Sequence, residues 1–114
     1  MFLHRRFVPG LSIFAYMVAD DTTGRCAVID PPRDVDPFIR IARREGLRID
    51  TIIESHVDAD FVSGARELAT RLDGEPRIVC SAEGGDAWVP DYADERVTHG
   101  DTLSLGTVRL EAMH

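Results

Sequence analysis

The chain has 114 residues, 44% of them hydrophobic and 29% charged, which suits one domain with a modest core and is too apolar for disorder. Its net charge of −7 argues against general nucleic-acid binding, which needs clustered lysine and arginine. It has no run of about 18 apolar residues and no signal-peptide pattern, so we expect a cytoplasmic protein that does not cross a membrane.

The first part of the chain has the pattern of paired strands. Residues 11–19 are almost all apolar, which predicts a strand buried on both faces. A polar turn with Gly24 leads into residues 26–30, which we expect to return beside it as a hairpin. Residues 2–8 are expected to add an edge strand.

Two amphipathic helices are expected to follow. Asp36 is the predicted N-cap of the first, with Pro37 at its first position, and Gly46 ends it. Ser63 is the predicted N-cap of the second, which stops at residues 73–74. Their apolar stripes are Val35, Phe38, Ile39 and Ala42 in the first helix, and Ala65, Leu68, Ala69 and Leu72 in the second.

The remaining apolar segments are expected to be strands. They are residues 47–55, 76–80, 102–105 and 107–113. Strands first, then helices alternating with strands, predict an α/β (α+β) fold in which helices cover one face of a mixed sheet.

The two cysteines are expected to be buried free thiols. Cys26 and Cys80 are far apart in sequence, and each lies in an apolar, strand-like run, which favours this interpretation over a disulfide. No basic residue adjoins Cys80 to lower its pKa, so we do not expect it to be a nucleophile.

The segment of greatest chemical interest follows the apolar run at residues 52–53. It places His56, Asp58 and Asp60 at alternate positions, with Glu54 just before them. An imidazole with carboxylates suits zinc, iron or manganese, and a cation would relieve the local negative charge. A polar loop in which an aspartate caps the next helix and His56 is exposed is the alternative.

Residues 54–68, E-S-H-V-D-A-D-F-V-S-G-A-R-E-L, resemble the metal-binding loop of the metallo-β-lactamase superfamily, T-H-x-H-x-D-H. They are most similar to the persulfide dioxygenase and rhodanese-associated branch, E-T-H-x-H-A-D-F-V-S-G. Residues 28–35, V-I-D-P-P-R-D-V, resemble that branch's V-I-D-P-x-R-D segment, and residues 84–88 and 100–111 also match it. The resemblance implies that residues 1–114 are the N-terminal half of an αββα sandwich, ending before the later metal ligands.

The resemblance also implies roles for individual residues. His56 matches the first motif histidine, a metal ligand, and Asp60 matches the motif aspartate. Asp58 stands where the motif has its second histidine. Phe61 replaces the last histidine, which argues against a two-zinc hydrolase site. His56, Asp58 and Asp60 are therefore the predicted metal residues.

The implied activity is oxidation of a glutathione-type persulfide to sulfite with O2 at one iron(II) ion, with zinc as the alternative metal. Two other functions stay open: a glyoxalase-II-like thioester hydrolase, and an inactive fragment that holds no metal. His114 matches only the first histidine of the family's H-T-P-G-H segment, so we expect this chain alone to be inactive. We also expect an uncovered sheet face and, through it, a homodimer.

Overall fold

The computed structural model describes residues 2–8, 13–32, 34–54, 64–72, 74, 76–81, 93–98, 100–106 and 108–111. Within these ranges it forms a six-stranded sheet in the order β1-β2-β3-β4-β5-β6 and a two-stranded sheet, β7-β8. The strands are β1 (Phe2–Val8), β2 (Ile13–Ala19), β3 (Arg25–Ile29), β4 (Arg48–Glu54), β5 (Arg77–Ser81), β6 (Glu95–Val97), β7 (Thr102–Leu105) and β8 (Val108–Glu111). The helices are α1 (Asp36–Glu45) and α2 (Ala65–Arg71).

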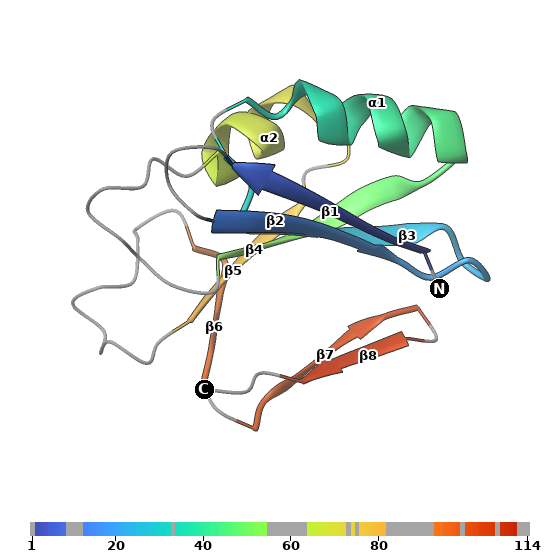
Figure 1. Ribbon diagram of the computed structural model, residues 1–114. Helices are drawn as coiled ribbons and strands as arrows, with labels where there is room; N and C mark the ends of the chain where they lie inside the picture. Colours follow the sequence, from blue (N-terminus) through green and yellow to red (C-terminus); the bar gives the residue numbers. More distant parts are fainter. Residues whose placement is uncertain are drawn as a thin grey trace.

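The large sheet is mixed, as the sequence predicts. β1, β2 and β3 pair antiparallel, whereas β3, β4, β5 and β6 pair parallel. α1 connects β3 to β4 and α2 connects β4 to β5, so both helices belong to crossovers between parallel strands. Figure 1 shows the two helices on one side of the sheet and the β7-β8 hairpin on the other. The carboxyl ends of β3, β4 and β5 therefore meet at one edge.

The core lies between the helices and the large sheet. Phe38 of α1 and Leu68 of α2 are fully buried against Met17, Val28 and Ile52 of the central strands. Burying one such side chain contributes about 1.5–3 kcal/mol. The predicted stripes of both helices thus supply the helical side of the core, with Leu72 and Ala69 partly buried at its margin.

Arginine side chains attach the hairpin to the opposite face of the sheet. Arg77 Nη2 and Arg25 Nη2 both donate to the Ser104 carbonyl oxygen, over 3.2 and 3.5 Å. Gly106 in the hairpin turn has φ +63°, and a Cβ there would overlap Asp20 Oδ2 and Thr23 Oγ1. A Cβ at this position would therefore force the Asp20 and Thr23 side chains to move.

Some predicted boundaries need correction. Val35, not Asp36, is the N-cap of α1, and it makes no side-chain cap bond. Asp36 is instead the first helical residue and forms an ion pair with Arg71. Gly64, not Ser63, is the N-cap of α2. The edge strand β6 was not predicted from the sequence.

Candidate metal-binding site

The predicted metal residues follow directly from the end of β4. That strand ends at Glu54, and the next described residue is Gly64. His56, Asp58 and Asp60, together with Phe61, fall between them and lie outside the described residues. The structure therefore fixes where this segment starts and ends, while the roles of its side chains stay predictions.

The start of the segment is held beside the end of β3. The Asp30 amide donates to the Ile53 carbonyl oxygen over 2.7 Å, which continues the pairing of β3 and β4 past the last residue of β3. Asp30 itself has φ +53°, a left-handed conformation that aspartate tolerates better than most residues. The chain turns at this residue into Pro31 and Pro32.

The end of the segment is held by the same turn. The Gly64 amide donates to the Pro31 carbonyl oxygen over 2.8 Å, and Gly64 then begins α2 by accepting from the Leu68 amide over 2.8 Å. Residues 30–32 thus bind the backbone on both sides of residues 55–63. Both ends of the segment lie at the carboxyl edge of the parallel strands, where α/β folds place their functional sites.

Buried carboxylates give this edge its electrostatic character. Glu54 is 4% exposed and Asp30 7% exposed. The Cys80 thiol donates to Glu54 Oε2 over 3.4 Å, which ties the end of β4 to β5. Two buried acidic residues at the edge where a segment with one histidine and two aspartates begins are compatible with a bound cation, because a cation offsets nearby negative charge.

The described residues do not form a metal site by themselves. Among them, no group of three or more His, Cys, Asp or Glu side chains is arranged to hold a metal ion. A metal at this edge would take ligands from residues 55–63, chiefly His56, Asp58 and Asp60, and Asp30 and Glu54 would act from outside its immediate shell. The resemblance pointed to residues 28–35, but the sequence alone did not place Asp30 beside the segment.

Both cysteines are buried and free, as predicted. Burial raises the pKa of Cys80 to about 12, with further contributions from the charge and hydrogen bond of Glu54 and from the charge of Asp94. The pKa of Cys26 is also raised to about 12, first by burial and then by Asp50. A thiol with so high a pKa holds little thiolate near neutral pH, so neither cysteine is suited to act as a nucleophile.

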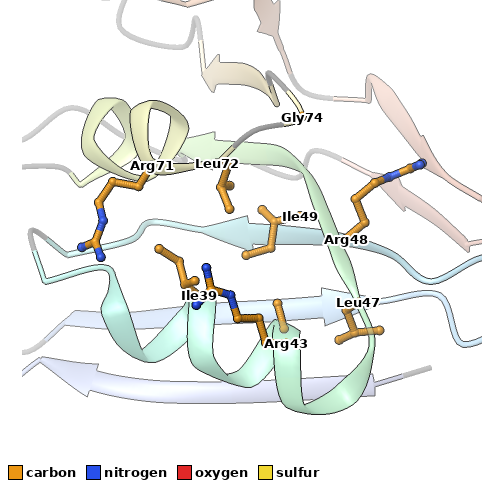
Figure 2. A pocket seen from close by; sticks show the side chains of 9 residues that line it. Ile39, Arg43, Leu47, Arg48, Ile49, Arg71, Leu72 and Gly74 are labelled. Atoms are coloured by element: carbon orange, nitrogen blue, oxygen red, sulfur yellow. The ribbon is translucent and has the colours of Figure 1, made fainter.

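A cavity of about 240 Å³ lies at the opposite end of β4 from the candidate site. Figure 2 shows the lining residues Ile39, Ile49 and Leu72 directed toward one another between the helices and β4, and Arg48 directed away from them. Arg71 pairs with Asp36, and Arg48 Nη2 lies 3.7 Å from Asp50 Oδ2. The positive charges of Arg48 and Arg71 are thus partly neutralised by aspartates. Arg43 and Arg71 also lie in the last turns of their helices, where a positive charge stabilises the helix, so these arginines have structural roles.

The fold is that of an α/β protein with a polar segment at the carboxyl ends of its parallel strands. Proteins of this class place their ligand-binding sites at that edge. Residues 8–112 match the family described as "Metallo-beta-lactamase superfamily". The chain belongs to this superfamily, whose members are generally metal-dependent. None of the helices that the structure describes is long and apolar enough to span a membrane.

The curated relatives cover nearly all of the chain. A probable metallo-hydrolase of Burkholderia pseudomallei is 33% identical over 95% of this chain and 45% of its own length. A hydroxyacylglutathione hydrolase of Methylobacterium sp. is 33% identical over 91% of this chain and 39% of its own. The chain thus spans less than half the length of either protein.

Solved structures agree with the fold. A metallo-beta-lactamase from Staphylococcus aureus superposes with a TM-score of 0.84 at 33% identity, over 99% of this chain and 33% of that one. ETHE1 from Myxococcus xanthus gives a TM-score of 0.83 at 23% identity, over 97% and 47%. The first likeness supports the family. The second, at its lower identity, supports the fold alone.

Proposed function

We propose that this chain forms the metal-binding half of an enzyme that acts on a small thiol derivative such as a glutathione persulfide. The observation that carries the proposal is the pair of contacts that hold both ends of residues 55–63 beside Asp30. Asp30 N donates to Ile53 O over 2.7 Å, and Gly64 N donates to Pro31 O over 2.8 Å. These contacts hold both ends of the segment that carries His56, Asp58 and Asp60 at the edge of the sheet where Asp30 and Glu54 are buried.

The chain's own residues would have separate tasks. His56 would bind the metal, Asp60 and Asp58 would bind it or orient its ligands, and the buried carboxylates of Asp30 and Glu54 would favour positive charge at the site. A bound iron(II) ion would supply open positions for the reactants. The remaining ligands would have to come from outside the described residues.

The proposed reaction is the oxidation of a persulfide at its terminal sulfur. In balance, RSSH + O2 + H2O gives RSH + SO3²⁻ + 2 H⁺. The S–S bond breaks, and the two sulfurs together lose four electrons, which O2 accepts. Phe61 supports this reaction over hydrolysis, because it replaces the last histidine of the motif that the segment resembles.

Thioester hydrolysis is the second candidate. It is favoured by the names of the curated relatives, since one at 33% identity is a hydroxyacylglutathione hydrolase and another a probable metallo-hydrolase. In that case the metal would activate water for attack on a carbonyl carbon. Both candidates share a small thiol-derived substrate and differ in whether O2 is consumed.

One experiment separates the candidates. The complete protein, of which this chain is proposed to be one half, is purified and loaded with iron(II) without oxygen. It is then supplied with glutathione persulfide and O2, or with a glutathione thioester. The proposal predicts equal consumption of O2 and formation of sulfite with the persulfide. Thioester cleavage without O2 uptake would establish the hydrolase instead. A folded protein that binds metal but converts neither substrate would contradict both and support a non-catalytic role.

Asp58 can be tested in the same preparation. Restoring the motif histidine with Asp58→His should tighten metal binding if residue 58 faces the metal, because imidazole is a better ligand than carboxylate for iron or zinc. Asp34→His, at an exposed position outside the segment, is the matched control. Equal metal affinity in the two variants would place residue 58 away from the metal.

A further inference from the structure

The contact between Gly64 and the Pro31–Pro32 backbone has no room for a side chain. A Cβ on Gly64 would overlap the Pro32 carbonyl oxygen and would come within 2.8 Å of both the Pro32 carbonyl carbon and Val35 Cγ1. Contacts this short force atoms apart, and two of the three atoms belong to backbone that cannot rotate away. Gly64 is buried, and its φ of −88° is ordinary, so close approach and not backbone conformation requires glycine here.

The same glycine marks the end of the segment that carries the predicted ligands. Its amide donates to Pro31 O and its carbonyl oxygen accepts from Leu68 N, both over 2.8 Å. Gly64 therefore joins the turn after β3 to the first turn of α2. At the other end, Asp30 N binds Ile53 O over 2.7 Å, so one three-residue turn, residues 30–32, sets the spacing between both ends of residues 55–63.

We propose that Gly64 is a positioning residue, which fixes the end of the metal-binding segment against Pro31 and Pro32 before any metal binds. A side chain at position 64 would push α2 and the end of the segment away from residues 30–32. The distance between the two ends of the segment that carries His56, Asp58 and Asp60 would then change. Holding ligands in place before binding increases affinity because less ordering remains to be done.

This inference rests on the proposed function in one respect, namely that residues 55–63 bind a metal. Beyond the proposed function, it assigns a role to Gly64, which has no side chain that could be a ligand. Loss of the contact should lower metal affinity and change ligand geometry by more than the accompanying loss of fold stability accounts for.

Cobalt(II) is a suitable probe, because its visible spectrum reports the number and geometry of its ligands. Cobalt(II) titrations of the complete protein are compared for wild type, Gly64→Ala, Gly74→Ala and Ile49→Ala. Gly74 has open space around it and is the glycine control. Ile49 is buried at the far end of β4 and is the control for lost stability.

The proposal predicts that Gly64→Ala weakens cobalt(II) binding by about tenfold or more and alters the visible spectrum, the size expected for residues that orient ligands. Gly74→Ala should match wild type, and Ile49→Ala should bind as wild type does despite a lower melting temperature. Affinity of Gly64→Ala within about twofold of wild type, well below that expected loss, would overturn the proposal. An equal loss in Ile49→Ala would also overturn it, because the effect would then reflect stability alone.

If Gly64→Ala does not fold, amide hydrogen exchange on the metal-free wild type tests whether the Gly64 contact forms before metal binds. Protection of the Gly64 amide comparable with that of the central strands supports a contact formed before metal binding, whereas exchange as fast as in an open chain overturns it. If the wild type binds no cobalt(II), the proposed function fails, and this exchange measurement still tests the contact by itself.

Discussion

Cys80 Sγ lies 3.4 Å from Glu54 Oε2 and donates a hydrogen bond to it, at the point where two neighbouring parallel strands end. Glu54 is the last residue of β4, and the segment with the predicted metal ligands follows it. The bond gives a buried carboxylate a donor from β5. The sequence shows two residues with no evident link, and the parallel register of β4 and β5 brings them together.

Replacing Cys80 should therefore cost more than replacing the other cysteine. Cys80→Ala removes a donor from a buried carboxylate as well as packing, and we expect it to lower the free energy of unfolding by about 1–3 kcal/mol more than Cys26→Ala. Among the hydrogen bonds of the described residues, Cys26 Sγ donates only to the carbonyl oxygen of the neighbouring Ala27, over 3.8 Å. Urea denaturation of both variants measures the difference, and equal losses would contradict a stabilising role for the bond.

Alkaline pH should destabilise the fold through the two thiols. The pKa of each rises from 9.0 to about 12 on folding, so the unfolded chain loses these protons at lower pH than the folded protein. Stability from this source is complete below about pH 9 and falls as the pH rises from about 9 to 12. Each thiol contributes a slope of up to about 1.4 kcal/mol per pH unit in that range.

The slope can be measured by chemical denaturation from about pH 8 to about pH 11, which spans most of the range in which the thiols titrate. The double variant Cys26→Ala/Cys80→Ala should lose stability less steeply than wild type over this range, although its stability at the lowest pH is smaller. Groups other than the thiols titrate in both proteins and cancel in the comparison. Parallel curves would show that the thiols do not retain their protons in the fold as the raised pKa values require.

Two glycines with left-handed backbone separate the cost of conformation from the cost of a close contact. Gly46 has φ +69° and nothing within 4 Å of the position that a Cβ would take, whereas Gly106 has φ +63° and abuts Asp20 and Thr23. Gly46→Ala should cost about 1–2 kcal/mol from backbone strain alone. Gly106→Ala should cost about 1–3 kcal/mol more, as overpacked sites do. Equal melting temperatures for the two variants would show that the hairpin turn accommodates a Cβ at residue 106 without added cost.

Arg77 should control how firmly the hairpin is attached. Its guanidinium donates to Thr51 Oγ1, Glu95 Oε1 and Ser104 O, at 3.3, 3.0 and 3.2 Å. Lysine cannot reproduce this planar arrangement of donors, so Arg77→Lys should cost about 0.5–1.5 kcal/mol and speed amide exchange in β7 and β8. Arg40→Lys, at an exposed position of α1, is the control. Unchanged exchange in the hairpin would assign its attachment to other contacts.

Much of the fold could be predicted because its signals are local. The apolar run that ends at Ala19, the helix stop at Gly46 and the apolar run at residues 52–53 are local signals of propensity and period. The structure confirms these elements and the placement of the helices on one face. β6 was missed because it has three residues and only Val97 is buried, so it carries no apolar period. The predicted N-cap of α1 was wrong by one residue, because proline is tolerated at either of the first two helical positions.

The candidate site could be predicted only in part. The ligand types and the superfamily follow from residues 54–68, and the superfamily is confirmed by the match over residues 8–112. The contact of Gly64 with Pro31 joins residues far apart in the chain, and no local pattern indicates it. The roles of His56, Asp58 and Asp60, the iron and the expected homodimer stay predictions.

Metal analysis of the complete protein shows whether residues 55–63 bind a metal through His56. Wild type, His56→Ala and His4→Ala are loaded with iron(II), freed of unbound metal and measured for iron and for folding. His4 lies in β1 and serves as the histidine control. Wild type and His4→Ala should hold stoichiometric iron, and a folded His56→Ala should lose it. Equal iron in all three proteins, or none in a folded wild type, would contradict it.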